Sequence, residues 1–266
     1  MRPRYALLVL ALSATLLAGC RPDAVRVAFE PTVGDTFVYA ITVDAVSDLV
    51  VEGREPQHRE DRIELIATHT VLAAEAGAIR VRVRLADVEG AVGARDFLVR
   101  YDRGGQLVGI DEVETLPSDL LGDIGLGEIF PAAAAAPPSG PLKPGDTWAI
   151  LAPLNLSGAS ESRLSGTGRL DRLGVEDGHR VATIATETSL SVTRTRSQAA
   201  STTTLAGTQS TSAAVTHDLS NGAVTRATSA TNGRFDLLIS PNASAATPEI
   251  VGELRVLIRS TTSRVV

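Results

Sequence analysis

Cys20 carries the only thiol in this chain of 266 residues, and Leu17, Ala18 and Gly19 stand directly before it. A cysteine thiolate is a nucleophile that can accept a covalent group. Small residues just before the thiol allow an extended chain to enter a peptidase site. Because the printed chain holds no second cysteine, an intramolecular disulfide is excluded. These residue types predict that Cys20 is covalently modified.

The residues before Cys20 have the pattern of a secretory signal. Arg2 and Arg4 are followed by a mostly apolar run over residues 5–17. This run of about 13 residues is shorter than the roughly 20 that a helix needs to cross a bilayer. The tetrad 17–20 resembles the bacterial lipobox, and the resemblance implies a signal peptide over 1–19, peptidase recognition of Leu17, Ala18 and Gly19, and acyl chains such as palmitate on Cys20. An ordinary signal peptide with a chance cysteine is the alternative.

No other set of residues predicts catalysis, a cofactor or a metal. The four histidines are far apart in the sequence and none stands beside the cysteine, so no local zinc motif is present. We expect His58, His69, His179 and His217 to be isolated surface residues. The sequence also has no Gly-x-Ser-x-Gly elbow with a following acid and histidine. We therefore expect a protein that is not an enzyme, with a hydrolase as the alternative.

The composition indicates which partners are not expected and which residue types build the core. The formal net charge is −6 with charges of both signs interspersed, and no basic patch with aromatics is present, so nucleic acid is not an expected partner. Aromatic residues make up only 3% of the chain, so the core must be built mainly from Val, Leu, Ile and Ala.

The elements that position these residues are expected to be strands. Residues 79–85 alternate strictly, with Ile, Val, Val and Leu on one face and three arginines on the other. Alternation of this kind is typical of a half-buried antiparallel strand, with the arginines on the solvated face. Acidic-Gly turns at 75–77, 102–105 and 176–178 punctuate such strands and favour hairpins. We therefore predict an all-β, mainly antiparallel protein.

An internal repeat organises the strands. Val33-Gly34-Asp35-Thr36-Phe37 recurs as Pro144-Gly145-Asp146-Thr147-Trp148, and two later hairpin segments match in the same order. In each copy the glycine is expected to open a turn, the aspartate to cap it through its side chain, and the aromatic to point inward. The halves are therefore predicted to be one β-meander in two copies, forming an open barrel or curved sheet with one short central helix.

The predicted boundaries follow from these motifs. They are a lipoprotein signal peptide over 1–19, a tether over 20–31, a first repeat with the helix over 32–131, an Ala/Pro linker over 132–143, and a second repeat over 144–266. The two repeats are expected to form one structural domain. Residues 197–210 are rich in Ser and Thr and read either as a low-complexity insert or as parts of two long strands.

The helix candidate covers residues 117–130, with Ser118 as its N-cap. Its apolar side chains suggest a lid over an apolar groove in the barrel, which would be a site for a lipid or another hydrophobic ligand. The candidate ligand-binding residues are Leu120, Leu121, Ile124 and Phe130. The alternative is that this groove is simply core and the helix its plug.

These motifs together resemble a family of bacterial lipoproteins to which no activity is assigned. The shared features are Cys20 in a lipobox, Gly34 to Phe37, Pro144 to Trp148, and Asp102 to Gly105. The resemblance implies an exported protein anchored in the cell envelope through Cys20. Arg21 in place of Asp after the cysteine, by resemblance to sorting rules, favours the outer membrane facing the periplasm in an organism with two membranes.

Two functions are consistent with the sequence. The first is a non-catalytic binding or envelope-structural module, anchored in the membrane and contacting an envelope protein. The second is a carrier or sensor of a lipid or other hydrophobic ligand. The state of the sheet interior, filled or open, separates the two.

Overall fold

The computed structural model describes residues 24–75, 78–88, 94–102, 105, 107–113, 137–154, 162–197, 201–241 and 249–265. In these ranges the chain forms eleven strands, which join in one sheet. The strand order is β5-β4-β3-β2-β1-β11-β10-β9-β8-β7-β6, and every neighbouring pair is antiparallel. The predicted all-β antiparallel fold is confirmed.

The strand bounds show six long strands at the centre of the sheet and shorter ones toward its edges. The strands are β1 Thr36–Val51, β2 Gln57–Ala74, β3 Ile79–Asp87, β4 Arg95–Tyr101, β5 Leu107–Val113, β6 Thr147–Leu154, β7 Ser162–Glu176, β8 His179–Ser197, β9 Ser201–Asp218, β10 Val224–Pro241 and β11 Ile250–Val265.

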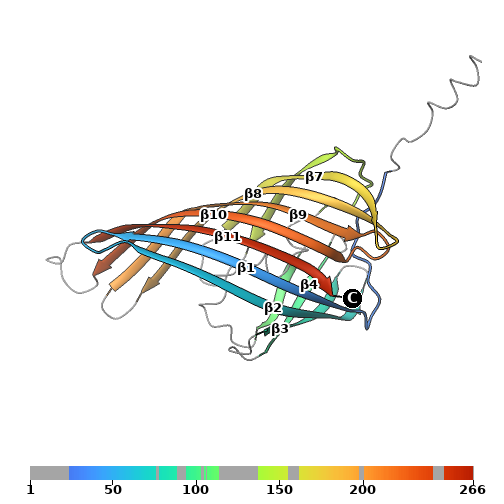
Figure 1. Cartoon of the computed structure of the whole chain (residues 1–266), viewed down its shortest axis with the longest axis horizontal. Coiled ribbons are helices and arrows are strands. Elements are labelled where there is room, and N and C mark those ends of the chain that lie inside the picture. Colours follow the sequence, from blue (N-terminus) through green and yellow to red (C-terminus); the bar gives the residue numbers. More distant parts are fainter. Residues whose placement is uncertain are drawn as a thin grey trace, which may run out of the picture.

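The sheet is open and curved. Strands β1 and β11 pair at its middle, while β5 and β6 stand at its two edges. Each of the ten pairings reverses the strand direction, so the edge strands β5 and β6 run in the same direction. The sheet therefore cannot close into a barrel by an antiparallel pairing of β5 with β6. Figure 1 shows the sheet as one long curved layer. The expected open barrel or curved sheet is therefore what the described residues form.

The two ends of the sheet differ. The base is the end where β1 and β6 begin, and the distal end is the one where β1, β8 and β10 end (Figure 1). The inner face is the one that carries Phe37, Tyr39, Ile41 and Val43 of β1, all buried. Because successive strand side chains alternate between faces, the whole inner face can be traced across the sheet from the register.

Strand β3 follows the predicted alternation. Ile79, Val81, Val83 and Leu85 are 3%, 1%, 0% and 6% exposed, whereas the arginines between them are exposed. The main core is built from such β-branched and aliphatic side chains at the base of the inner face. The arginines lie on the solvated outer face, as expected.

Residues 24–31, here called the strap, pack against the base of the sheet. Val25 pairs with Leu142 through two backbone hydrogen bonds of 2.8 Å, and both side chains are buried. Val27 is 3% exposed, and the Glu30 N–H donates to the Asn221 carbonyl at 2.8 Å. The described part of the expected tether is therefore packed into the core, as is the end of the expected linker.

The two Gly-Asp-Thr segments form the same turn. The Asp35 carboxylate accepts from the Thr32 N–H at 2.8 Å, and the Asp146 carboxylate accepts from the Lys143 N–H at 2.8 Å. The glycine φ angles are 94° at Gly34 and 93° at Gly145. A bulge also follows each turn on the neighbouring strand, after Val71 in β2 and after Leu170 in β7. The turn roles expected from the sequence are therefore what the structure shows.

Two other expectations fall in or near incompletely described segments. Strands β8 and β9 run to Ser197 and from Ser201, so the strand interpretation of the Ser/Thr-rich region is right for the described residues. The helix candidate at 117–130 lies outside the described residues, as do the signal peptide and Cys20.

Candidate functional site

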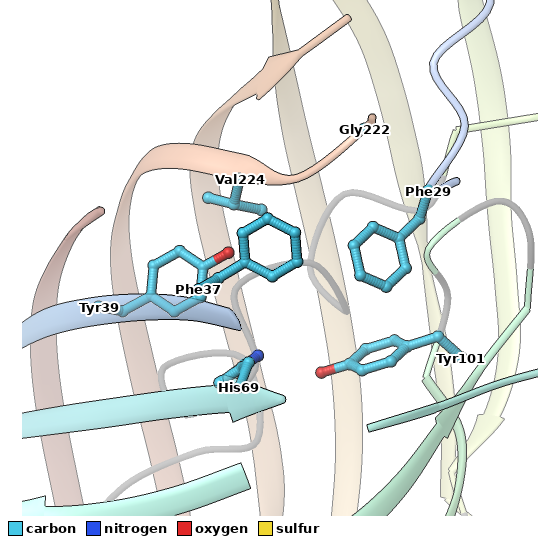
Figure 2. A pocket seen from close by; sticks show the side chains of 7 residues that line it. All are labelled: Phe29, Phe37, Tyr39, His69, Tyr101, Gly222 and Val224. Carbon is cyan, nitrogen blue, oxygen red and sulfur yellow. The ribbon is translucent and has the colours of Figure 1, made fainter. Parts of the chain in front are cut away.

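A small cavity lies at the base, where the strap meets both halves of the sheet. It measures about 20 Å³ and is lined by Phe29, Phe37, Tyr39, His69, Tyr101, Gly222 and Val224. Phe29 comes from the strap, Phe37 and Tyr39 from β1, His69 from β2 and Tyr101 from β4, whereas Gly222 and Val224 come from the turn into β10 (Figure 2). Four of the nine aromatic residues of the chain therefore gather around one cavity.

Aromatic contacts build the walls of this cavity. The Phe29 ring lies 5.7 Å from that of Tyr101 in an edge-on arrangement, and 6.3 Å from that of Phe37. The Tyr39 ring lies 4.9 Å from the His69 imidazole, also edge-on. Edge-to-face pairs at these distances add stability beyond the burial of apolar area. Phe29 thus fixes the strap to the two strands that carry Phe37 and Tyr101.

Two polar atoms of the cavity are buried without a hydrogen-bond partner among the described residues. They are Nε2 of His69 and the hydroxyl oxygen of Tyr101. Burial lowers the pKa of His69 to about 4, because a charged imidazolium would lose its hydration. Burial likewise raises the pKa of Tyr101 and of Tyr39 above the ordinary range, against the opposing Arg264 charge in the case of Tyr39. All three side chains are therefore neutral near pH 7.

The expectation that all four histidines are surface residues is wrong for two of them. His69 and His217 are 8% and 3% exposed, whereas His58 and His179 are exposed. His69 stands two residues after Ala67 and therefore points to the inner face with Leu65 and Ala67. The alternation of Leu65 and Ala67 in the sequence, continued by one more step, already places His69 on the same buried face. His217 donates through Nδ1 to the Gly222 carbonyl at 3.0 Å.

Asp218 beside this cavity closes a turn. Its carboxylate accepts from the Ser220 N–H at 2.9 Å and from the Ser220 hydroxyl at 2.7 Å. Burial opposes ionisation of Asp218, but these hydrogen bonds and the nearby His179 and Arg264 charges hold its pKa below the ordinary value. A carboxylate so satisfied by its own turn is a structural group, not a general base.

The inner face toward the distal end is apolar and only partly covered. Leu190, Val192 and Phe235 form a second cluster, with Leu164, Leu205, Leu254 and Val256 packed against it and partly exposed. The register extends this surface, here called the distal inner face, through further partly exposed residues. These are Leu49, Leu237, Ile239 and Ile250. From Val256 to Ile250 the surface runs about 20 Å along β11.

A band of hydroxyl residues lies on the inner face of β9 and β10, between Phe235 of the second cluster and the core residues Val215 and Ala227. Thr211 and Thr231 share a hydrogen bond of 2.8 Å, and Ser229 and Ser260 share another of 2.8 Å. Both pairs join neighbouring strands on the inner face. Because these buried hydroxyls satisfy one another, they cost little in this position. On β11 the apolar surface continues into the core, because Val256 packs against both clusters.

The outer face carries exposed ion pairs. Arg62 lies 3.3 Å from Asp44 and 2.9 Å from Glu64, and His58 lies 2.7 Å from Asp48. Exposed pairs of this kind contribute little to stability. Within the described ranges, no group of three or more His, Cys, Asp or Glu side chains is placed to hold a metal ion. No helix in those ranges has the length and apolarity needed to cross a membrane.

Leu17, Ala18, Gly19 and Cys20 lie outside the described residues, and so do the four candidate ligand-binding residues, Leu120, Leu121, Ile124 and Phe130. The cavity was not predicted, and the apolar groove that the sequence suggested was assigned no strand residues. Both the cavity and the distal inner face depend on strand register, which sequence patterning did not supply.

Comparison with known proteins finds no matching family model and no matching curated protein. Among solved structures, one match is Pseudomonas aeruginosa OccK2 (OpdF) in complex with glucuronate, at 7% identity over 87% of this chain and 97% of that chain, with a TM-score of 0.23. Another is OmpTdeltaL8, a loop L8 deletion mutant of OmpT, an outer membrane protein of Vibrio cholerae. It is 5% identical over 88% of this chain and 100% of that chain, with a TM-score of 0.23. Similarity at this level carries no inference about function.

Proposed function

We propose that this chain is an exported, lipid-anchored protein of the cell envelope that acts by binding and not by catalysis. The observation that carries the proposal is Cys20 behind Leu17-Ala18-Gly19 and a charged, then apolar, N-terminus. Two or more acyl chains on the N-terminal cysteine would give stable anchoring, whereas one chain gives only marginal binding. By the residue after Cys20, the anchor belongs in the outer membrane, facing the periplasm.

The strap supports this proposal by its position. Ala24 begins the described chain four residues after Cys20, and Val25 is already held by Leu142. Four extended residues span at most about 14 Å. An anchor on Cys20 would therefore keep the base of the sheet next to the membrane. The six central strands of 16 to 19 residues would place the distal end about 50 to 60 Å from the base.

The distal inner face is the surface we assign to binding, and its ligand is an apolar chain such as the acyl chain of a lipid. Its side chains are Leu, Val, Ile and Phe, most of them are partly exposed, and the register places them on one face of the curved sheet. The surface runs about 20 Å, which exceeds the roughly 15 Å of one hydrocarbon leaflet. One acyl chain laid along the strands fits within this length.

The anchor is tested by metabolic labelling in the native host with radioactive palmitate. The chain is expected to take up label and to fractionate with membranes, whereas a Cys20→Ser variant should take up none. As a control, the amount of the Cys20→Ser protein is measured in the same cells, because loss of the whole protein would also remove the label. Absence of label from the unchanged, abundant chain contradicts the anchor.

The ligand is tested on the chain from residue 21 onward, which keeps every described residue. A fluorescent fatty acid should bind it, and Leu254→Asp should weaken binding about tenfold or more, because a buried leucine contributes about 1.5–3 kcal/mol. Leu257→Asp is the matched control, since Leu257 stands three residues away on the same strand but on the outer face. Equal binding by both variants contradicts the assignment.

A further inference from the structure

The cavity at the base contains the two unpartnered polar atoms that the proposed function leaves without a role. Figure 2 shows the Tyr101 hydroxyl and the His69 ring directed toward each other across the cavity. Tyr101 is 2% exposed and His69 is 8% exposed, so bulk water does not solvate either group. Neither the hydroxyl oxygen nor Nε2 has a hydrogen-bond partner among the described residues.

Buried polar groups without partners are rare in folded proteins because their desolvation is not compensated. Two of them facing one cavity therefore require a common explanation. Phe29 and Phe37 also line the cavity, and their side chains carry no hydrogen-bonding atom. Tyr39 also lines the cavity, and its hydroxyl is a further polar side-chain group there.

The size of the cavity decides the class of ligand. A cavity holds one water molecule when about 10–15 Å³ is accessible to it, and this one measures about 20 Å³. A lipid, a sugar or an amino acid is excluded by volume. A single water molecule can donate two hydrogen bonds and accept two. One molecule can therefore satisfy both a hydroxyl and an imidazole nitrogen.

We propose that this cavity is a binding site for one water molecule, which bridges the Tyr101 hydroxyl and Nε2 of His69. The hydroxyl donates to the water, and the water donates to Nε2. This arrangement requires the His69 tautomer that carries its proton on Nδ1. The water thereby joins β2 to β4, under the Phe29 ring that holds the strap in place.

The direct test is a crystal structure of the purified protein at a resolution that shows ordered water. The expected result is a single peak within about 2.7–3.2 Å of both atoms. A dry cavity overturns the proposal, and so does a direct hydrogen bond between Tyr101 and His69. The nitrogen shifts of the His69 imidazole, measured by NMR near pH 7, should report the Nδ1-protonated tautomer. The opposite tautomer also overturns it.

Variants test the bridge in solution. Tyr101→Phe removes only the hydroxyl and should lower the melting temperature by several degrees in the unchanged background. In the His69→Leu background, the same change should lower it by less than half as much, because the water has already lost one of its two anchors. Thr231→Val is the matched control, because it removes a buried hydroxyl that bonds Thr211 away from the cavity, and its effect should be the same in both backgrounds. Additive effects of Tyr101→Phe and His69→Leu contradict a shared water.

Discussion

Trp148 lies across Gly168, its direct register partner on the neighbouring strand. A β-carbon on Gly168 would stand 2.3 Å from Cε2 of the indole, which is closer than atoms can approach. The glycine therefore makes room for the ring that follows the second Gly-Asp-Thr turn. The first repeat places the smaller Phe37 opposite His69 at the matching point of β1 and β2.

This contact predicts that Gly168→Ala is destabilising. Moving the indole away from an added methyl group should lower the free energy of unfolding by about 1–3 kcal/mol, as overpacking does elsewhere. Urea unfolding followed by the Trp148 fluorescence measures it. Gly174→Ala on the same strand is the control, since its β-carbon would meet only Val181 at an ordinary 3.8 Å. A comparable loss in both variants would show that the close contact is not the cause.

The two turns capped by aspartate predict that removing either aspartate lowers the free energy of unfolding by the same amount. Asp35→Ala and Asp146→Ala each remove an acceptor for one backbone N–H, at 2.8 Å in both turns. Each should lower the free energy of unfolding by about 1 kcal/mol. Asp35→Asn, which keeps an acceptor oxygen, should lose less. A large loss at one turn and none at the other would weigh against the duplication that the sequence predicts.

Burial of His69 predicts a loss of stability in acid. The pKa is about 4 in the folded protein and near 6.5 in the unfolded chain, so the unfolded chain binds more protons between these values. The free energy of unfolding should therefore fall by about 3 kcal/mol as the pH drops from 6.5 to 4. Chemical denaturation at a series of pH values measures this fall, and His69→Leu should make it smaller.

Two other histidines provide the comparison for that experiment. Burial also lowers the pKa of His217, so part of the acid sensitivity should persist in His69→Leu. Hydrogen bonds to Asp48 and then Glu60 raise the pKa of the exposed His58, which gives the opposite sign. Its contribution is present below pH 6.5 and is lost as the pH rises. If His58→Gln flattened the acid transition as much as His69→Leu, burial would not be its origin.

The core at the base predicts that two leucine-to-alanine substitutions differ strongly in their effect on stability. Leu170 is 0% exposed and Leu151 is 80% exposed, on neighbouring strands. Leu170→Ala should lower the free energy of unfolding by about 2–5 kcal/mol, because it leaves a cavity in packed surroundings. Leu151→Ala should change it by less than about 0.5 kcal/mol. Guanidinium unfolding of both variants checks the difference, and similar values would mean that β6 and β7 are not packed as described.

Several parts of this fold were predictable because they depend on local chemistry. Residues 79–85 alternate by hydrophobicity, and a strand with one buried face requires that pattern. Gly34 and Gly145 stand where positive φ is needed, and an aspartate follows each to accept from the turn backbone. The burial of His69 was equally available in the phase of β2, but the expectation of surface histidines overrode it.

The sequence by itself determined the strands, the turns and the pattern of inner and outer faces, because these follow from alternation and from backbone conformations over a few residues. It also supplied the motif at Cys20, whose residue types predict covalent modification. Only the tertiary structure decided which strands meet. The pairing of β1 with β11, the strap against Leu142, and the cavity between His69 and Tyr101 join residues from about 30 to more than 200 positions apart. Contacts of that range depend on register and on packing of the whole sheet, which no local pattern encodes.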